Sequence, residues 1–151
     1  MRIALTADHN GIAYKQRFAA LLRELGHQVE DRGGDDPGAV VDYPPLCAEL
    51  SRSVASGAVD RGVVIGGSGQ GEAIACNKVR GIRAGLCQDL FGVGISRGNN
   101  DSNVLVLGAK VVSLELAEQL LRAWLDTPFK GGVHARRIEQ IAELERGELP
   151  A

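Results

Sequence analysis

The sequence predicts a single α/β domain, a three-layer α/β/α sandwich built on a Rossmann-like open parallel five-stranded sheet. Short apolar segments alternate with longer segments of helical periodicity along the whole chain, which is the pattern of parallel strands joined by helices. The chain has 151 residues, enough to bury one core without a metal or a disulfide. Because no linker or internal repeat interrupts the pattern, we expect residues 1–151 to form one domain.

The first half of the chain supplies two strands and two helices. Residues 2–8 are apolar, partly β-branched and end at a polar cluster, as expected of a buried strand followed by a loop. A segment with apolar residues at helical spacing follows and stops at Gly26, a typical helix C-cap. Residues 28–31 form the second strand. After a Gly/Asp/Pro-rich loop, a second helix begins near Pro45, where a missing backbone N–H costs little.

The second half continues the alternation. Strands are predicted at residues 62–67, 82–87 and 103–109, because each segment is short, apolar and bounded by glycine or polar residues. The segments between them, 71–79 and 88–100, form a short helix and a glycine-interrupted helix. Five strands result, each separated from the next by a predicted helix.

Two helices close the chain. Residues 113–126 are amphipathic, with apolar side chains on one face. Residues 133–148 are so charged that they cannot bury a whole side in the core of one domain. The last of these helices is therefore expected to contribute little to that core.

Charge and composition exclude several classes of partner. The net charge is -2, and acidic and basic residues are mixed along the chain, which leaves no footprint for nucleic acid or an acidic membrane surface. Neither a charged leader nor a span of about twenty apolar residues is present. Three cysteines, Cys47, Cys76 and Cys87, are odd in number and lie within apolar patterns, which favours reduced thiols. We expect a cytoplasmic protein that binds neither nucleic acid nor membranes.

Polar residues gather in the loops where such a sheet binds ligands. In open parallel sheets, ligands lie outside the carboxyl ends of the strands. The loops after the first, third and fifth strands carry Asp8 with His9, Gly66–Glu72 and Gly108–Lys110, and the loop before the fifth strand adds Asn99–Asp101. We expect these segments to contribute to one site.

The segment GGSGQGE, residues 66–72, does not match a nucleotide-binding loop. A dinucleotide fingerprint fails because its sixth position is Glu72, and a Walker loop would need lysine there. Free backbone N–H groups beside a carboxylate suit proton abstraction next to a carbonyl, because the carboxylate takes the proton and the N–H groups stabilise the enediolate. A glycine turn in which Glu72 only complements the helix dipole is the alternative.

Five segments spread over nearly the whole chain carry a family resemblance. They are ADHNGIAYKQ (Ala7–Gln16), DYP (Asp42–Pro44), GGSGQGEAIACNKVRGIRA (Gly66–Ala84), NNDSNVLVLGAKVV (Asn99–Val112) and HARRIEQI (His134–Ile141). With these segments the chain resembles the type B ribose-5-phosphate isomerases and their galactose-6-phosphate and allose-6-phosphate isomerase relatives. The resemblance implies an aldose-ketose isomerase that needs no cofactor or metal and acts on a sugar phosphate through a cis-enediolate.

The resemblance also implies a role for each matching polar residue. One branch of the family uses a cysteine at the position of Gly67, and the other uses the glutamate that matches Glu72, so glycine at 67 makes Glu72 the base. Ser68 matches a hydroxyl that orients this carboxylate, and Asp8 matches a residue that contacts the sugar hydroxyls. The remaining residues implied to bind substrate are His9, Gly67, Gly69, Gln70, Gly71, Asn99, Asn100, Lys110, His134, Arg136 and Arg137.

Three positions depart from the family pattern. Asn99 stands where the family has a histidine that opens the furanose ring, and asparagine cannot exchange a proton near neutral pH. Lys110 and Val133 stand where the family has arginines that bind phosphate, so lysine keeps only the charge and valine loses it. Arg136 is a possible substitute. The changes concern ring opening and phosphate placement rather than enolisation.

These departures leave the substrate open between a pentose and a tetrose phosphate. A four-carbon 4-phosphate cannot close a furanose ring and needs no ring-opening acid, so erythrose 4-phosphate and erythrulose 4-phosphate are candidates beside ribose 5-phosphate. Alternatively, His9 with Asp8 opens the ring, or the enzyme uses the fraction of substrate that is already open.

Two other classes of function stay open at this stage. One is a sugar-phosphate-binding regulatory module without turnover, and the other is a nucleotide-binding stress-type domain, which the carboxylate of Glu72 disfavours. The resemblance further implies a homodimer or homotetramer with a shared active site. In such an assembly, the C-terminal helix, about residues 134–148, would pack on a neighbouring subunit.

Overall fold

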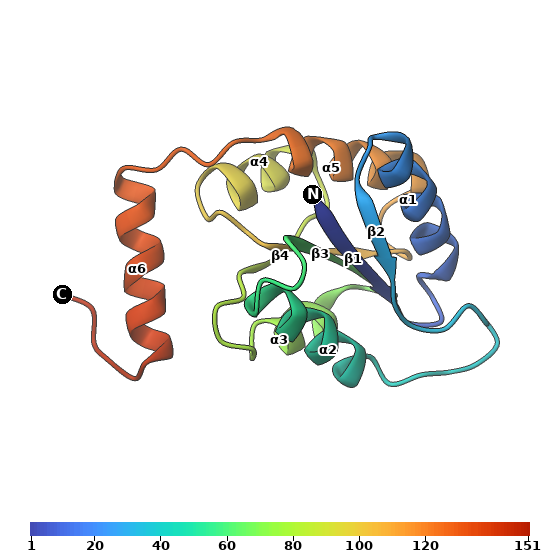
Figure 1. Cartoon of the computed structure of the whole chain (residues 1–151), viewed down its shortest axis with the longest axis horizontal. Coiled ribbons are helices and arrows are strands. Elements are labelled where there is room, and N and C mark those ends of the chain that lie inside the picture. Colours follow the sequence, from blue (N-terminus) through green and yellow to red (C-terminus); the bar gives the residue numbers. More distant parts are fainter.

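The computed structural model describes residues 1–151 as a three-layer α/β/α sandwich, beside which the last helix stands apart (Figure 1). The elements are β1 (Arg2–Ala7), α1 (Ile12–Glu24), β2 (Gln28–Asp31), α2 (Tyr43–Ala55), β3 (Arg61–Gly66), α3 (Gln70–Cys76), β4 (Ala84–Leu86), α4 (Leu90–Gly98), β5 (Val104–Gly108), α5 (Leu114–Asp126) and α6 (Val133–Glu145). The predicted fold class and all eleven predicted elements are confirmed.

The sheet has the strand order β2-β1-β3-β5-β4, and all neighbouring strands are parallel. From β1 the chain first adds β2 on one side and then crosses to β3 on the other. The order therefore reverses between β1 and β3, and ligands bind at such a switch point in open parallel sheets. The loops that follow these two strands hold the Asp8 and Gly66–Glu72 segments.

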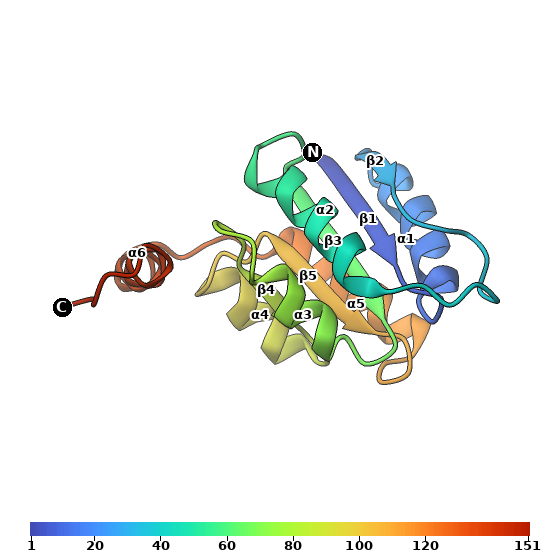
Figure 2. The ribbon, with the colours of Figure 1, turned by 90° about the horizontal axis from the view of Figure 1, so that it is seen from below.

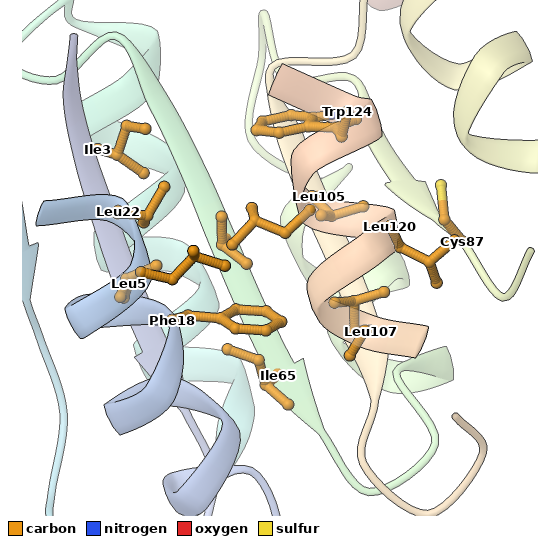
Figure 3. Packing of buried hydrophobic residues seen from close by; sticks show 14 of the residues in the cluster. Ile3, Leu5, Phe18, Leu22, Ile65, Cys87, Leu105, Leu107, Leu120 and Trp124 are labelled. Carbon is orange, nitrogen blue, oxygen red and sulfur yellow. The ribbon is translucent and has the colours of Figure 1, made fainter. Parts of the chain in front are cut away.

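Two apolar clusters hold the layers together. The larger lies between the sheet and helices α1, α4 and α5, and it includes the fully buried side chains of Phe18, Leu105 and Trp124 (Figure 3). The smaller lies on the opposite face under α2 and α3, the two helices seen together across the sheet in Figure 2. Burial of each large apolar side chain contributes about 1.5–3 kcal/mol, which is why the sheet is a rigid base for its loops.

The ends of several elements differ slightly from the prediction. The first helix ends as predicted, with Gly26 in the left-handed region at φ 82°. Helix α3 stops at Cys76, three residues early, because the Asn77 side chain turns the chain toward β4. Its Nδ2 donates to the carbonyl of Ala73 at 3.0 Å, and its Oδ1 accepts from the N–H of Ala84 at 2.8 Å.

One lysine is buried completely, which the helical pattern of α1 did not indicate. The Lys15 ammonium donates to Asp31 at 2.6 Å and to Asp35 at 3.0 Å, and to the carbonyl of Gly34 at 3.2 Å. Burial lowers the pKa of Lys15, but the hydrogen bonds and charges of the two aspartates outweigh it and raise the pKa overall. The lysine thereby ties the loop after β2 to α1.

Helix α6 has no buried residue, which confirms that it adds nothing to the core. In both views it projects from the sandwich at the end of an extended segment (Figures 1 and 2). It contacts the rest of the chain where the Glu145 carboxylate accepts the N–H of Gly81 at 3.1 Å. No helix of the chain has the length and hydropathy needed to cross a membrane.

Gly11 allows the loop after β1 to lie directly against the end of β3. A β-carbon at this position would stand 2.6 Å from the Ile65 carbonyl oxygen, closer than real β-carbons approach other atoms. The same Ile65 carbonyl accepts the backbone N–H of Asp8 at 3.1 Å. The absence of a side chain at Gly11 thus fixes Asp8 beside the glycine loop.

We expect Gly11→Ala to lower the free energy of unfolding by about 1–3 kcal/mol, because the methyl group forces the two loops apart. The measurement is urea denaturation. Gly94→Ala is the matched control, since Gly94 lies inside α4 with no neighbouring atom within 4 Å of the added carbon. Alanine there should stabilise the helix by about 0.5–1 kcal/mol. Equal losses of unfolding free energy from Gly11→Ala and Gly94→Ala would contradict the close contact between Gly11 and Ile65.

Candidate active site

The glycine loop presents backbone N–H groups that have no acceptor within the chain. The amides of Gly67, Ser68, Gly69 and Gly71 donate no hydrogen bond, whereas the Gln70 N–H donates to the Ser68 hydroxyl at 3.2 Å. The loop reaches this form because Gly69 adopts φ 79°, a left-handed conformation. Unpaired N–H groups grouped in this way suit a negatively charged oxygen.

The carboxylate of Glu72 folds back over this loop instead of pointing into solvent. It lies against the α-carbon of Gly66, where any β-carbon would overlap it, and the residue is only 4% exposed. No other side chain donates a hydrogen bond to it. Burial, together with the charge of Asp8, raises the pKa of Glu72 above its usual range. A carboxylate held in this state is a stronger proton acceptor than an exposed one.

Asp8 and His9 lie on the neighbouring loop and are held by Asn10. Asp8 is 7% exposed, and its two carboxylate oxygens accept from the backbone N–H of Asn10 at 2.8 Å and from its side-chain Nδ2 at 2.9 Å. The same Nδ2 lies 3.4 Å from Nε2 of His9. Asp8, His9 and Glu72 are therefore brought together, as the sequence predicts.

Lys110 completes this end of the sheet. Its backbone N–H donates to the carbonyl of Gly67 at 2.9 Å. Its side chain packs on the same glycine, because Cδ lies 3.7 Å from the place where a β-carbon of Gly67 would be. The Lys110 side chain is exposed and forms no ion pair within the chain. A cation is thus available next to the loop.

Asn99 and Asn100 do not join this cluster within one chain. They precede β5, so they lie at the amino ends of the strands, where the Asn103 carbonyl accepts from the N–H of Gly62 at 3.0 Å. Glu72 follows the carboxyl end of β3. The length of β3, five residue steps of about 3.3 Å, separates the two groups by about 16 Å.

His134, Arg136 and Arg137 are also apart from Glu72, because they lie on the projecting helix α6 (Figure 1). The turn that carries Asn99 is held by contacts of Arg97. The Arg97 guanidinium donates to Asp101 at 2.8 Å and packs over the ring of Trp124 at 5.7 Å. One chain therefore holds two separate sets of the predicted residues.

The Asn99 side chain is oriented by a lysine. Lys130 donates from Nζ to Oδ1 of Asn99 at 2.9 Å, and its backbone N–H donates to the carbonyl of Gly98 at 2.9 Å. Oδ1 of Asn99 is therefore an acceptor here, and its Nδ2 group has no partner within the chain. An amide neither takes up nor releases a proton near neutral pH, so Asn99 can form hydrogen bonds but cannot transfer a proton.

Ser68 differs in detail from the expectation that it orients the carboxylate. Its Oγ accepts from the Gln70 N–H, and no hydrogen bond joins it to Glu72. The hydroxyl hydrogen of Ser68 is free, and its side chain is exposed. The serine can donate to a ligand rather than to the base.

Two residues of this region were not among those predicted. Asn10 directly follows Asp8 and His9, so its place in the polar cluster was the available signal. Tyr43 places its hydroxyl against the α-carbon of Gly71, and its position in the segment DYP was the signal there. No group of three or more His, Cys, Asp or Glu residues is arranged to hold a metal ion.

Comparisons with known proteins find similar sequences and structures over nearly the whole chain. The model of the family described as Ribose/Galactose Isomerase matches residues 3–141. Ribose-5-phosphate isomerase B of Escherichia coli is 41% identical over 96% of this chain and 97% of its own. D-erythrulose-4-phosphate isomerase of Pectobacterium atrosepticum is 36% identical over 98% of this chain and 97% of its own. The structure of Clostridium thermocellum ribose-5-phosphate isomerase B superimposes with a TM-score of 0.95 at 41% identity, covering 97% and 99% of the two chains.

We expect Glu72→Gln to raise the melting temperature by about 2–8 °C at about pH 8, because it removes a buried charge but keeps the shape. The raised pKa means that the folded state disfavours the ionised form. The free-energy cost of the ionised Glu72 is present when the pH is above the pKa of Glu72 in the folded state. It disappears when the pH falls below the ordinary pKa of glutamate, because the carboxyl group is then neutral in both the folded and the unfolded state. The gain should therefore vanish near about pH 4. Glu115→Gln, at an exposed site, is the control. A lower melting temperature for Glu72→Gln at about pH 8 would contradict the assignment of Glu72 as a buried carboxylate with a raised pKa.

Proposed function

The chain belongs to the Ribose/Galactose Isomerase family and is a sugar-phosphate isomerase, and we propose that it interconverts the aldose and ketose forms of a four- or five-carbon sugar phosphate. One observation carries the chemical part of this proposal. The buried carboxylate of Glu72, whose pKa is raised by burial and by Asp8, lies beside the free N–H groups of Gly67, Ser68, Gly69 and Gly71.

In the proposed reaction, Glu72 removes the proton from the carbon next to the carbonyl. The negative charge that develops on the carbonyl oxygen is stabilised by the N–H groups of the glycine loop, which gives a cis-enediolate. Glu72 then returns the proton to the neighbouring carbon, while the Ser68 hydroxyl gives a proton to the former carbonyl oxygen and takes one from the neighbouring oxygen. A positioned base contributes about 10²–10⁴ in rate, and each oxyanion donor about 3–4 kcal/mol.

The other groups at this edge bind the substrate. Asp8 and His9 face the sugar hydroxyls, and the free hydrogen of Ser68 donates to a substrate oxygen. Gln70 belongs to the same loop. The ammonium of Lys110 is the cation on this side that attracts the phosphate.

We assign the complete site to a homodimer in which the carboxyl-end edge of one chain meets the amino-end edge and α6 of its partner. The proposal is supported by the separation of the two sets of residues, which one chain cannot bring together. It is also supported by the hollows of the single chain, none of which is lined by Glu72. In the dimer, the phosphate is bound by Lys110 of one subunit and by His134, Arg136 and Arg137 on α6 of the other.

Exposed apolar side chains mark surfaces for this association. Ile74 on α3 is 63% exposed and Phe91 on α4 is 79% exposed. On α6, Ile141 and Leu144 are exposed as well. A helix without a buried residue needs a partner for such side chains. A dimer or tetramer would cover them, with α6 packed on the neighbouring subunit.

A cytoplasmic location is part of the proposal. The three cysteines are free and buried, which suits a reducing compartment.

The substrate choice depends on Asn99 and Val133. The similar proteins include both a ribose-5-phosphate isomerase and a D-erythrulose-4-phosphate isomerase. Because the Asn99 amide accepts a hydrogen bond from Lys130 but exchanges no proton near neutral pH, it cannot open a furanose ring. A tetrose 4-phosphate needs no such step, and its phosphate lies about one carbon, roughly 1.5 Å, nearer the base. We therefore favour the tetrose phosphate as substrate.

Solvent deuterium exchange tests the function directly. The protein should catalyse exchange of the proton next to the carbonyl of erythrulose 4-phosphate, followed by NMR, and Glu72→Gln should lower the rate by about 10²–10⁴-fold. A sugar-phosphate-binding module without turnover would bind the compound but exchange nothing.

The same assay with ribulose 5-phosphate decides the substrate. We expect a lower rate of turnover on the pentose, and we expect Asn99→His to raise it because histidine can move a proton. Strong ribose 5-phosphate turnover by the unchanged protein would rule out the tetrose preference.

Mixing two inactive variants tests the shared site. Glu72→Gln damages one edge of the chain, and Arg137→Ala damages the other. After unfolding and refolding together, half of the dimers are mixed, and each mixed dimer has one intact site. Activity should return to about a quarter of the unchanged level. If both edges served a site within one chain, mixing would restore nothing.

A further inference from the structure

The Asn10 amide is surrounded by the three groups that define the substrate-binding edge. Its Nδ2 lies 2.9 Å from Oδ2 of Asp8 and 3.4 Å from Nε2 of His9. It also lies 3.2 Å from where a β-carbon of Gly67 would be, so the amide rests directly on that glycine. Neither the proton transfer nor the substrate contacts proposed above use Asn10.

The orientation of this amide is fixed by its partners. Only the nitrogen of an amide can lie 2.9 Å from a carboxylate oxygen in a hydrogen bond, so Nδ2 is the atom that faces Asp8. An amide nitrogen donates but does not accept. Nε2 of His9 must therefore be the acceptor, and the proton of the neutral ring is on Nδ1.

This tautomer places the histidine proton away from the site. Nδ1 of His9 is buried and has no hydrogen-bond partner in the chain, so it cannot deliver its proton to a substrate. Nε2, the other ring nitrogen, is held by Asn10. The Asp8 carboxylate is likewise held, because Asn10 donates to both of its oxygens. Asn10 thus occupies both groups that could otherwise move a proton to or from a ring oxygen.

We propose that Asn10 is a specificity-determining positioning residue, which prevents His9 and Asp8 from opening a furanose ring and restricts the enzyme to open-chain sugar phosphates. The proposal rests on the isomerase function above and names the substrate class of the same site. Asn99 acts in the same direction from the amino-end edge, since an amide held by Lys130 exchanges no proton. Glu72 remains the group that transfers the proton between the two carbons.

Gly67 belongs to this arrangement. A side chain at position 67 would approach Nδ2 at 3.2 Å and Cγ of Asn10 at 3.4 Å, so the amide would have to move by a few tenths of an ångström. The glycine therefore lets Asn10 sit over the loop without covering its free N–H groups.

The test compares Asn10→Ala with the unchanged protein on two probes, ribose 5-phosphate, which cyclises, and erythrose 4-phosphate, which does not form a furanose. Release of His9 should raise the ratio of kcat/KM for the pentose over the tetrose by about tenfold. Asn10→Ser, which keeps one donor, should give an intermediate ratio. A purely structural role would lower both values of kcat/KM equally and leave the ratio unchanged, which would overturn the proposal.

The double variant His9→Gln/Asn10→Ala identifies the group that is released. If His9 opens the ring, the gain on ribose 5-phosphate should disappear in the double variant. A gain that persists would contradict the role of His9. An unchanged protein that exchanges no substrate proton at all would instead defeat the proposed function, so the two failures are distinguishable.

A nitrogen-15 NMR spectrum gives a readout that does not depend on activity. In the unchanged protein, His9 should be the Nδ1-protonated tautomer, and in Asn10→Ala the Nε2-protonated form should become populated. The Nε2-protonated form in the unchanged protein would overturn the proposal.

Discussion

The close approach of two loops, made possible by missing side chains, determines how this site is built. Gly11 lets the loop after β1 lie on the end of β3, and Gly66 leaves room for the Glu72 carboxylate to fold back over the same strand end. Each contact would be lost if a β-carbon were present. The two carboxylates of Asp8 and Glu72 are consequently buried near each other, and the chain bears the electrostatic cost in the raised pKa of Glu72.

The hydrogen bonds around these carboxylates make them unequal. Both oxygens of Asp8 accept N–H groups from Asn10, whereas Glu72 accepts none from another side chain. Burial, with the nearby charge of Asp8, raises the pKa of Glu72. In the proposed mechanism, this inequality makes Glu72 the group that takes up a proton and leaves Asp8 to contact the substrate.

The fold and one half of the site were predictable from the sequence, because both follow from local patterns. Apolar periodicity indicates each strand and helix. Strands β1 and β3 place Asp8 and Glu72 at one edge of the sheet, at the point where the strand order reverses. The place of Asn99 was not predictable in this way. A residue before β5 belongs to the opposite edge, and only a second chain would bring it to Glu72. The roles of Asn10 and Lys130 were also hidden, since their hydrogen bonds depend on contacts that residue spacing does not encode.

A proton balance links the residues at both edges to the substrate. Isomerisation moves one proton between two carbons and a second proton between their oxygens. Glu72 can perform the first transfer. For the second, Ser68 retains a free hydroxyl hydrogen, because its oxygen accepts from the Gln70 N–H while its own O–H has no partner. Opening a furanose ring would require a third transfer, for which the proposed mechanism uses neither His9 nor Asn99. His9 is held by Asn10, and Asn99 is an amide that accepts a hydrogen bond from Lys130 and transfers no proton. Under the proposed mechanism, these proton-transfer groups serve an open-chain sugar phosphate rather than a cyclic one.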